Sequence, residues 1–169
     1  DHRIRIAGSP FPVKTLTVTY NDGVVTVKND GNGIPVTKLE SGKWNPSVCL
    51  GELLSSTNYD DSEERLGGGR NGVGSAVTNI WSQRFCLQTC WQDDQGDRWA
   101  FSQEWKDNMV HASTPKIKEK VKKGLGTTVS FLPDYERFGV TDEEWPFLES
   151  LLRRRLYDIA ATTPLRVTF

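Results

Sequence analysis

The stretch GGGRNGVGS, residues 67–75, holds five glycines in nine residues and directly precedes an amphipathic run. Glycine lets backbone amides approach a ligand closely, and the N-terminus of a helix favours an anion. The fixed positive charge of Arg70 adds to that preference. The stretch therefore predicts a phosphate-binding loop, and a flexible linker before a helix is the alternative interpretation.

Two widespread phosphate loops do not fit these residues. A Walker A loop ends in Gly-Lys-Ser/Thr, whereas Gly74-Ser75 follows a valine and has no lysine after it. A dinucleotide-binding fingerprint comes directly after a buried strand, whereas the polar sequence YDDSEERL precedes these glycines. Backbone amides at the start of a helix from Asn71 therefore remain the expected phosphate ligands.

A second candidate element is NDGNGIP, residues 29–35, which directly follows a predicted strand. Gly31 and Gly33 would let the backbone approach a flat ligand, and the Asn29 amide could pair with the edge of a heterocycle. Asn, Asp and Gly are also ordinary turn residues, so a plain turn is the alternative.

Taken together and in order, these segments closely resemble the ATPase domain of type II DNA topoisomerases of the eukaryotic type. This domain belongs to the GHKL superfamily, which also includes chaperone and mismatch-repair ATPases. The resemblance covers nearly the whole chain. It rests on NDGNGIPV, LLSSTNYDD, GGRNGVGSAVTNIWS, GTTVSFLPD and RRRLYDIAATTPLRVTF.

The resemblance implies ATP as the bound nucleotide, with Mg²⁺, and it assigns roles by position. Asn29 would recognise adenine, Gly33 and Ile34 would line its pocket, and Thr127 would lie near the base. The lid that reaches the ribose and phosphates would comprise Ser56, Thr57 and Asn58. The loop around the triphosphate would comprise Gly69, Arg70, Asn71, Gly72, Val73, Gly74 and Ser75.

The chain also departs from the family pattern. The resemblance places the catalytic glutamate and the magnesium-binding asparagine on a helix before Asp1, and a γ-phosphate lysine in a domain after Phe169. We therefore expect residues 1–169 to be a single ATP-binding domain, cut at both ends, with no catalytic or metal-binding residue of its own and no hydrolysis by itself. Ala76 stands where the family often has a lysine.

For the intact protein, the resemblance implies ATP-driven closure of a homodimer and passage of one DNA duplex through another. It also implies an intracellular location, nuclear if the source is eukaryotic. Two alternatives are a nucleotide-binding scaffold without hydrolysis and a chaperone or mismatch-repair ATPase. The GGRNGVGS loop argues against the chaperone and mismatch-repair types.

The elements that must position these loops follow from hydrophobic periodicity. Alternation around Asn21-Asp22-Gly23 predicts a hairpin, and residues 83–105 predict a second one. A helix is expected from Asn45, with Leu53 and Leu54 among its apolar positions. A second is expected from Asn71, with one apolar face formed by Val73, Ala76, Val77, Ile80 and Trp81. A third is expected over about five turns, marked by Trp145, Leu148, Leu152, Leu156 and Ile159. A polar loop is expected at 55–69, a lysine-rich surface connection at 107–124, and strands at 126–133 and 164–169. Because strands and helices do not alternate regularly, the fold class is α+β, a mixed or antiparallel sheet with helices on one face. The resemblance names this arrangement the Bergerat ATP-binding fold, an α/β sandwich.

Composition sets further limits. The 21 basic and 22 acidic residues balance, which argues against a surface built mainly to coat nucleic acid. The basic run 116–123 is interpreted as a solvated loop, and a patch that faces DNA is the alternative. No run approaches the roughly 20 apolar residues of a membrane span. Cys49, Cys86 and Cys90 lack metal-site spacing and form an odd set, which favours a reducing environment over a disulfide framework.

Overall fold

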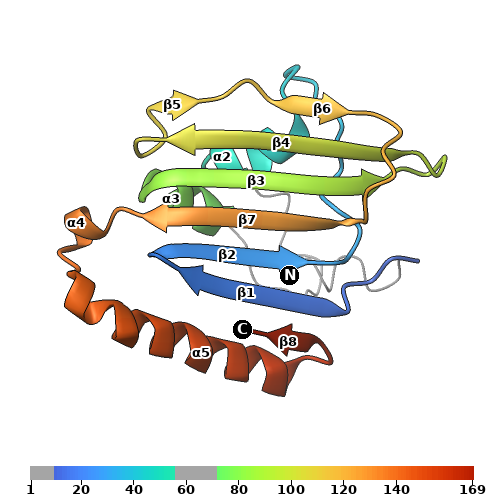
Figure 1. Ribbon diagram of the computed structural model, residues 1–169. Coiled ribbons are helices and arrows are strands. Elements are labelled where there is room, and N and C mark those ends of the chain that lie inside the picture. The colour runs from blue at the N-terminus through green and yellow to red at the C-terminus, as the bar shows by residue number, and fades with distance from the viewer. Residues whose placement is uncertain (1–9, 56–71) are drawn as a thin grey trace, which may run out of the picture.

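A computed structural model describes residues 10–55 and 72–169 of the chain. Eight strands form one sheet in the spatial order β5-β4-β3-β7-β2-β1-β8, with β6 beside β4 (Figure 1). Neighbouring strands are antiparallel except for β1 and β8, which are parallel. The strands are β1 (Thr15–Asn21), β2 (Val24–Asn29), β3 (Ser82–Gln92), β4 (Arg98–Lys106), β5 (His111–Ala112), β6 (Lys116–Lys118), β7 (Gly126–Pro133) and β8 (Arg166–Thr168).

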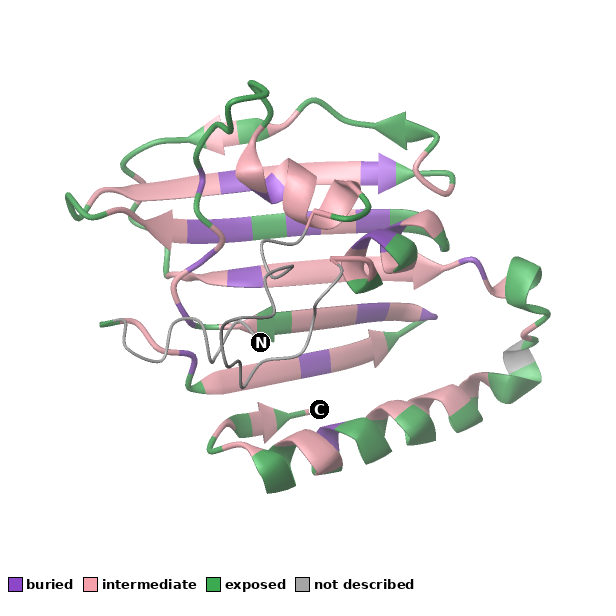
Figure 2. Ribbon diagram, turned by 180° about the vertical axis from the view of Figure 1, so that it is seen from behind, coloured by how far each residue is buried: buried purple, intermediate pink, exposed green. Residues whose placement is uncertain are grey.

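The main helices cover one face of this sheet. Figure 1 looks onto the other face, which carries no helix and is called the bare face below, whereas Figure 2 shows α2 and α3 in front of the strands. This arrangement confirms the predicted α+β class with helices on one face. The helices are α2 (Asn45–Gly51), α3 (Gly74–Ile80), α4 (Tyr135–Phe138) and α5 (Trp145–Thr162), with a 3₁₀ turn at Asp142–Glu144.

Both predicted hairpins are present. The first turns at Asp22-Gly23, where φ is +48° and +77°, as a two-residue turn between right-handed twisted strands requires. The second pairs β3 with β4 over nine registered residue pairs. The long C-terminal helix is also confirmed as α5, with 18 residues.

Two apolar clusters hold the helices on the sheet. The first joins β3 and β4 to the chain before and within α2, around Phe85, Leu87, Phe101 and Trp105. The second places Leu156 of α5 against Val18 and Val25. Because Phe131 packs against both clusters, the covered face has one continuous apolar layer.

The helix expected from Asn71 is shorter than predicted, and the side chains that it buries differ in part from the predicted ones. Its first helical residue is Gly74, and Asn71 lies outside the described residues. On its predicted apolar face Ala76 is fully buried, as expected, whereas Val77 and Trp81 are each 37% exposed. The polar Asn79, which lies outside the predicted face, is fully buried. The polar Asn79 faces inward because its Nδ2 donates to the Leu50 carbonyl of α2 at 3.1 Å.

Two other predictions need correction. Helix α2 ends at Gly51, so Leu53 and Leu54, expected on its apolar face, lie beyond it and are 52% and 65% exposed. The connection at 107–124 is not purely irregular, because β5 and β6 pair with β4 at the edge of the sheet. Short edge pairing of this kind satisfies backbone groups that a loop would leave to water.

The three cysteines, Cys49, Cys86 and Cys90, are free thiols. Burial raises the pKa of both the Cys86 and Cys90 thiols, so neither is an activated nucleophile. Among the helices in the described ranges, none is long and apolar enough to cross a bilayer.

Candidate functional site

Three polar residues lie side by side on the covered face of the sheet. Asn29 at the end of β2 is registered with Thr127 of β7, which is registered in turn with Thr89 of β3. The two threonines are buried, and their hydroxyl oxygens are 2.9 Å apart. The neighbouring positions on this face are apolar, including Val27, Val129 and Leu87. A polar row set into an apolar surface is typical of a ligand site with a few orienting groups.

The loop after β2 is fastened to this row through its backbone. Ile34 N–H donates to Thr89 Oγ1 at 2.9 Å, and Gly33 N–H donates to the Cys90 carbonyl at 3.1 Å. Thr89 Oγ1 also lies 3.3 Å from the Gly126 carbonyl and can donate to it. Thr127 then donates to Thr89, which leaves the Thr127 oxygen lone pairs open to a donor.

Side chains of the same loop add further anchors. Asn32 donates through Nδ2 to the Gln92 carbonyl at 3.1 Å and accepts from Gln92 N–H at 2.8 Å. Asp30 Oδ1 accepts from the amides of Lys14 and Thr15 at 2.9 and 2.8 Å. Partial burial opposes ionisation of Asp30, but these backbone hydrogen bonds outweigh it and lower the pKa of its carboxyl. The loop is therefore tied to β1 and β3 at several points.

Two glycines here are required by close packing. A Cβ on Gly33 would lie 2.3 Å from the Cys90 carbonyl oxygen and 2.4 Å from Thr89 Oγ1. Gly126 has φ of +140°, and a Cβ there would lie 2.2 Å from the Asn29 carbonyl oxygen. The backbone of β2 and its following loop can thus press against β3 and β7 only because both positions lack a side chain.

The Asn29 side chain carries the chief anomaly of the site. Its Oδ1 is buried and has no hydrogen-bond partner among the described residues. Buried polar atoms nearly always have a partner, since an unpaired one costs about 1–3 kcal/mol. An acceptor left open beside Thr127 therefore suits a ligand that brings its own N–H donor.

The start of α3 lies on the same covered face and forms the other candidate element. Gly72 has φ of +60°, Val73 is the residue before the helix, and Gly74 begins it. No described atom lies within 4 Å of a Cβ placed on Gly74. Ser75 Oγ donates to the Cys49 carbonyl of α2 at 3.1 Å, so this hydroxyl joins α3 to α2 in the structure.

The described residues therefore bring together Asn29, Gly33, Ile34 and Thr127, and they place Gly72, Val73, Gly74 and Ser75 at the start of α3. The remaining predicted residues, Ser56, Thr57, Asn58, Gly69, Arg70 and Asn71, lie outside the described residues, as does most of the predicted lid at 55–69.

Sequence reasoning missed the role of Thr89. It stands in an ordinary alternating strand, QRFCLQTCW, where it is the polar residue among the inward-facing Phe85, Leu87 and Trp91. This polar position on an otherwise apolar strand face could have indicated the role of Thr89, because a buried threonine needs a hydrogen-bond partner. Asn32 lies within the loop motif, but only the structure shows its two hydrogen bonds with the backbone of Gln92.

The metal expected from the resemblance has no match in these residues. Within 10–55 and 72–169, no group of three or more His, Cys, Asp or Glu side chains could hold an ion. The donor set that Mg²⁺ prefers, carboxylate and carbonyl oxygens, is therefore not gathered here.

Known proteins share both the sequence and the fold. The chain is 43% identical over 160 residues to DNA topoisomerase 2 of Plasmodium falciparum, covering 94% of this chain and 11% of that protein. It is 38% identical over 155 residues to DNA topoisomerase 2 of Acanthamoeba polyphaga mimivirus, covering 91% and 12%. No family model matches the chain.

Among solved structures, the ATPase region of Saccharomyces cerevisiae topoisomerase II superposes with a TM-score of 0.83 at 35% identity. The match covers 99% of this chain and 44% of that one. This chain spans about a tenth of the length of the relatives given above. By sequence and by fold, the chain belongs with the ATPase regions of the type II DNA topoisomerases, within the GHKL superfamily.

Proposed function

We propose that this chain binds ATP on the covered face of the sheet, with adenine against the row of Asn29, Thr127 and Thr89. The open Asn29 Oδ1 carries the proposal, because adenine presents an amino group as donor at its N6 edge. Guanine presents a carbonyl oxygen at the corresponding position and would leave two acceptors facing each other. Gly33 and Ile34 would form the wall of this pocket, held by Thr89 and Cys90.

The triphosphate is proposed to lie toward the start of α3. The open space above Gly74 supports this placement, since a phosphate oxygen can approach the backbone there without meeting a side chain. Gly69, Arg70, Asn71, Gly72, Val73 and Ser75 are proposed to complete the phosphate loop. Ser56, Thr57 and Asn58 are proposed to contact the ribose and phosphates as a lid over residues 55–69.

As part of a longer enzyme, the domain is proposed to drive a type II DNA topoisomerase reaction. ATP binding would close a homodimer, and hydrolysis would accompany passage of one duplex through another. The relatives named DNA topoisomerase 2 support this function, and no observation favours the scaffold or chaperone alternatives. The magnesium ion, the DNA partner, the dimer and an intracellular location, nuclear in a eukaryote, belong to the same proposal.

Substitution of Asn29 tests the adenine assignment. Asn29→Ala should weaken binding of a non-hydrolysable ATP analogue about 10- to 100-fold and affect the GTP analogue much less, because a buried polar pairing discriminates strongly. Asn29→Asp keeps an acceptor at the same place and should retain the preference for adenine. Titration calorimetry on the folded variants gives both affinities.

The same variant separates a ligand contact from a turn residue. Removing an unpartnered buried oxygen should leave the thermal stability of the ligand-free chain unchanged or slightly higher. Equal losses of affinity for ATP and GTP, or a clear drop in stability without nucleotide, would show that Asn29 serves only the turn.

A further inference from the structure

The bare face of the sheet is polar. Its cations are paired with Glu104 at the end that holds Arg84 and Lys106, whereas the other end carries lysines without such partners. One registered row crosses five strands from Lys28 of β2 through Thr128, Gln88 and Ser102 to Lys116 of β6. With strands about 4.8 Å apart, the backbones at the two lysines of this row are about 19 Å apart.

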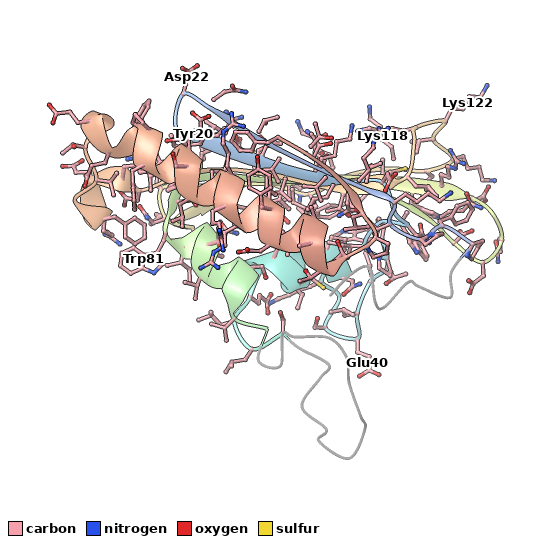
Figure 3. All side chains as sticks on the ribbon, turned by 90° about the horizontal axis from the view of Figure 1, so that it is seen from below. Tyr20, Asp22, Glu40, Trp81, Lys118 and Lys122 are labelled. Atoms are coloured by element: carbon pink, nitrogen blue, oxygen red, sulfur yellow. The ribbon has the colours of Figure 1, made fainter. Side chains whose placement is uncertain are left out.

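A hollow lies on this row. It has a volume of about 400 Å³, and its lining includes Lys28, Gln88, Thr128, Lys123 and Gly124. Asn29, Thr89, Cys90, Leu125 and Gly126 complete the lining, so the hollow adjoins the strand ends that carry the proposed adenine row. The segment that leads from β6 into β7, residues 116–123, forms the rim beside it and is called the lysine segment below. Figure 3 shows Lys118 and Lys122 of this segment on the side of the sheet opposite α2 and α3.

Most of these lysines have no opposing charge. All six lysines of this surface are exposed, and Lys120 pairs with Asp97 at 3.6 Å. Among the described residues, no ion pair involves the other five, which are Lys28, Lys116, Lys118, Lys122 and Lys123.

Most carboxylates near this surface already have partners other than these five lysines. Glu104 pairs with Arg84 and Lys106, and hydrogen bonding to Arg84 lowers its pKa. Asp30 is held by two backbone amides. Glu119 is the acidic residue within the lysine segment itself. A chain of net charge −1 therefore concentrates five unpaired cations on one surface.

The side chains between these lysines favour contacts with phosphates. Thr128, Gln88 and Ser102 offer hydroxyl and amide donors of the kind that bind phosphate oxygens. Strand alternation across β1, β2, β3, β4 and β7, all within the described chain, brings no aromatic side chain to the bare face. A surface for stacking single-stranded bases would need such rings.

We propose that the bare face and the lysine segment form a docking surface for the phosphate backbone of double-stranded DNA, contacted by Lys28, Lys116, Lys118, Lys122 and Lys123. This surface lies on the opposite side of the sheet from the proposed nucleotide site. The choice of DNA over another polyanion rests on the proposed topoisomerase function, whereas the surface itself rests on the charges and hydrogen-bond donors described above.

The test measures binding of the chain to a fluorescein-labelled 30-base-pair duplex by anisotropy at several salt concentrations. Changing Lys116, Lys118, Lys122 and Lys123 together to glutamine should weaken binding at least about tenfold at 0.1 M salt. Each lost phosphate contact should also reduce the slope of log K against log salt by about 0.9. The same four positions changed to arginine should bind as the unaltered chain does.

A matched control removes four cations that lie away from this surface. Glutamine at Lys38, Lys43, Arg154 and Arg155 makes the same change in net charge and should leave the DNA affinity and the salt slope unchanged. Affinity for an ATP analogue, measured on all variants, should stay constant, so failure of the nucleotide proposal is seen separately.

Three results would overturn the proposal. One is absence of duplex binding by the unaltered chain, and another is an equal loss of binding in the control variant. The third is competition by polyglutamate of equal charge that matches competition by unlabelled duplex, which would identify an acidic protein segment as the partner instead.

Discussion

At the adenine end of the proposed site, a methyl group on Gly33 would lie 2.3 Å from the Cys90 carbonyl oxygen. At the phosphate end, one on Gly74 would meet no described atom within 4 Å. The first glycine is needed by the folded chain itself, since the loop after β2 presses on β3 there. The second is not needed by the packing of the described residues, which leaves its open space to a ligand. The two glycine-containing motifs therefore have different physical causes: close backbone packing at Gly33 and open space at Gly74.

The hydrogen bonds of the two ends differ in the same way. The adenine end is tied to β1 and β3 through Asp30, Asn32, Gly33 and Ile34. At the phosphate end, the residue before α3 makes no side-chain cap, and Ser75 is the described residue there that ties the helix start to α2 through its side chain. Substitution of the residues that anchor the adenine end should accordingly disturb folding, whereas substitution at the start of α3 should disturb ligand binding.

The largest effect is expected for Gly33→Ala. Its Cβ would overlap backbone atoms that cannot move alone, so we expect a loss of more than about 3 kcal/mol in the free energy of unfolding. Urea denaturation measures the change. Gly124→Ala is the matched control, because nothing lies within 4 Å of its added Cβ. A Gly33→Ala chain as stable as the control would show that the contact with Cys90 is not needed.

Gly74→Val should lower the affinity for nucleotide and leave the stability of the fold almost unchanged. We expect the affinity for an ATP analogue to fall at least about 100-fold, because the side chain fills the space proposed for phosphate, a loss of roughly 2.7 kcal/mol. The free energy of unfolding should change by less than about 1 kcal/mol. Calorimetry and urea denaturation measure the two quantities. Unchanged affinity in the folded variant would remove Gly74 from the site.

An intermediate effect is expected where the adenine end meets β3. Thr89→Val removes the acceptor of the Ile34 amide, which should cost about 1–3 kcal/mol of stability. Thr127→Val removes a hydroxyl whose described hydrogen bond is to Thr89, and should cost about 1 kcal/mol. Urea denaturation of both single variants and the double variant tests the order, and an equal cost for the two would contradict the proposed anchoring by Thr89.

The smallest effect concerns the pH dependence of Asp30→Asn. The pKa of Asp30 is lowered below its ordinary value of 3.8 in the folded chain. The stabilisation by its carboxylate is therefore present above that ordinary value and is lost as the pH falls through the lower folded pKa. The difference in melting temperature between the two chains should be largest near neutral pH and should shrink toward about pH 2. A difference independent of pH would indicate that the charge does not matter.

Patterns of single elements were predictable from the sequence. Alternation gave the two hairpins, and the spacing of Trp145, Leu148, Leu152 and Leu156 gave α5. Helix α3 was harder, because its apolar periodicity placed Val77 and Trp81 beside the buried Ala76, whereas the polar Asn79 is buried in their place. A polar side chain can be buried when a hydrogen-bond acceptor lies beside it. The acceptor of Asn79 is the Leu50 carbonyl, which belongs to another helix and so cannot be found from the periodicity of α3.

The class of fold, the glycine-containing loops and the choice of Asn29 as a candidate were predictable from the amino-acid sequence, since they depend on short-range periodicity and on a contiguous motif. The pairing of β2, β7 and β3 was not predictable in this way, and it places Thr89, 60 residues from Asn29, in one row with it. The tertiary structure also decided that Lys28 and the lysine segment share the bare face. The register between distant strands sets both groupings, and register arises from packing across the whole sheet, which no local pattern contains.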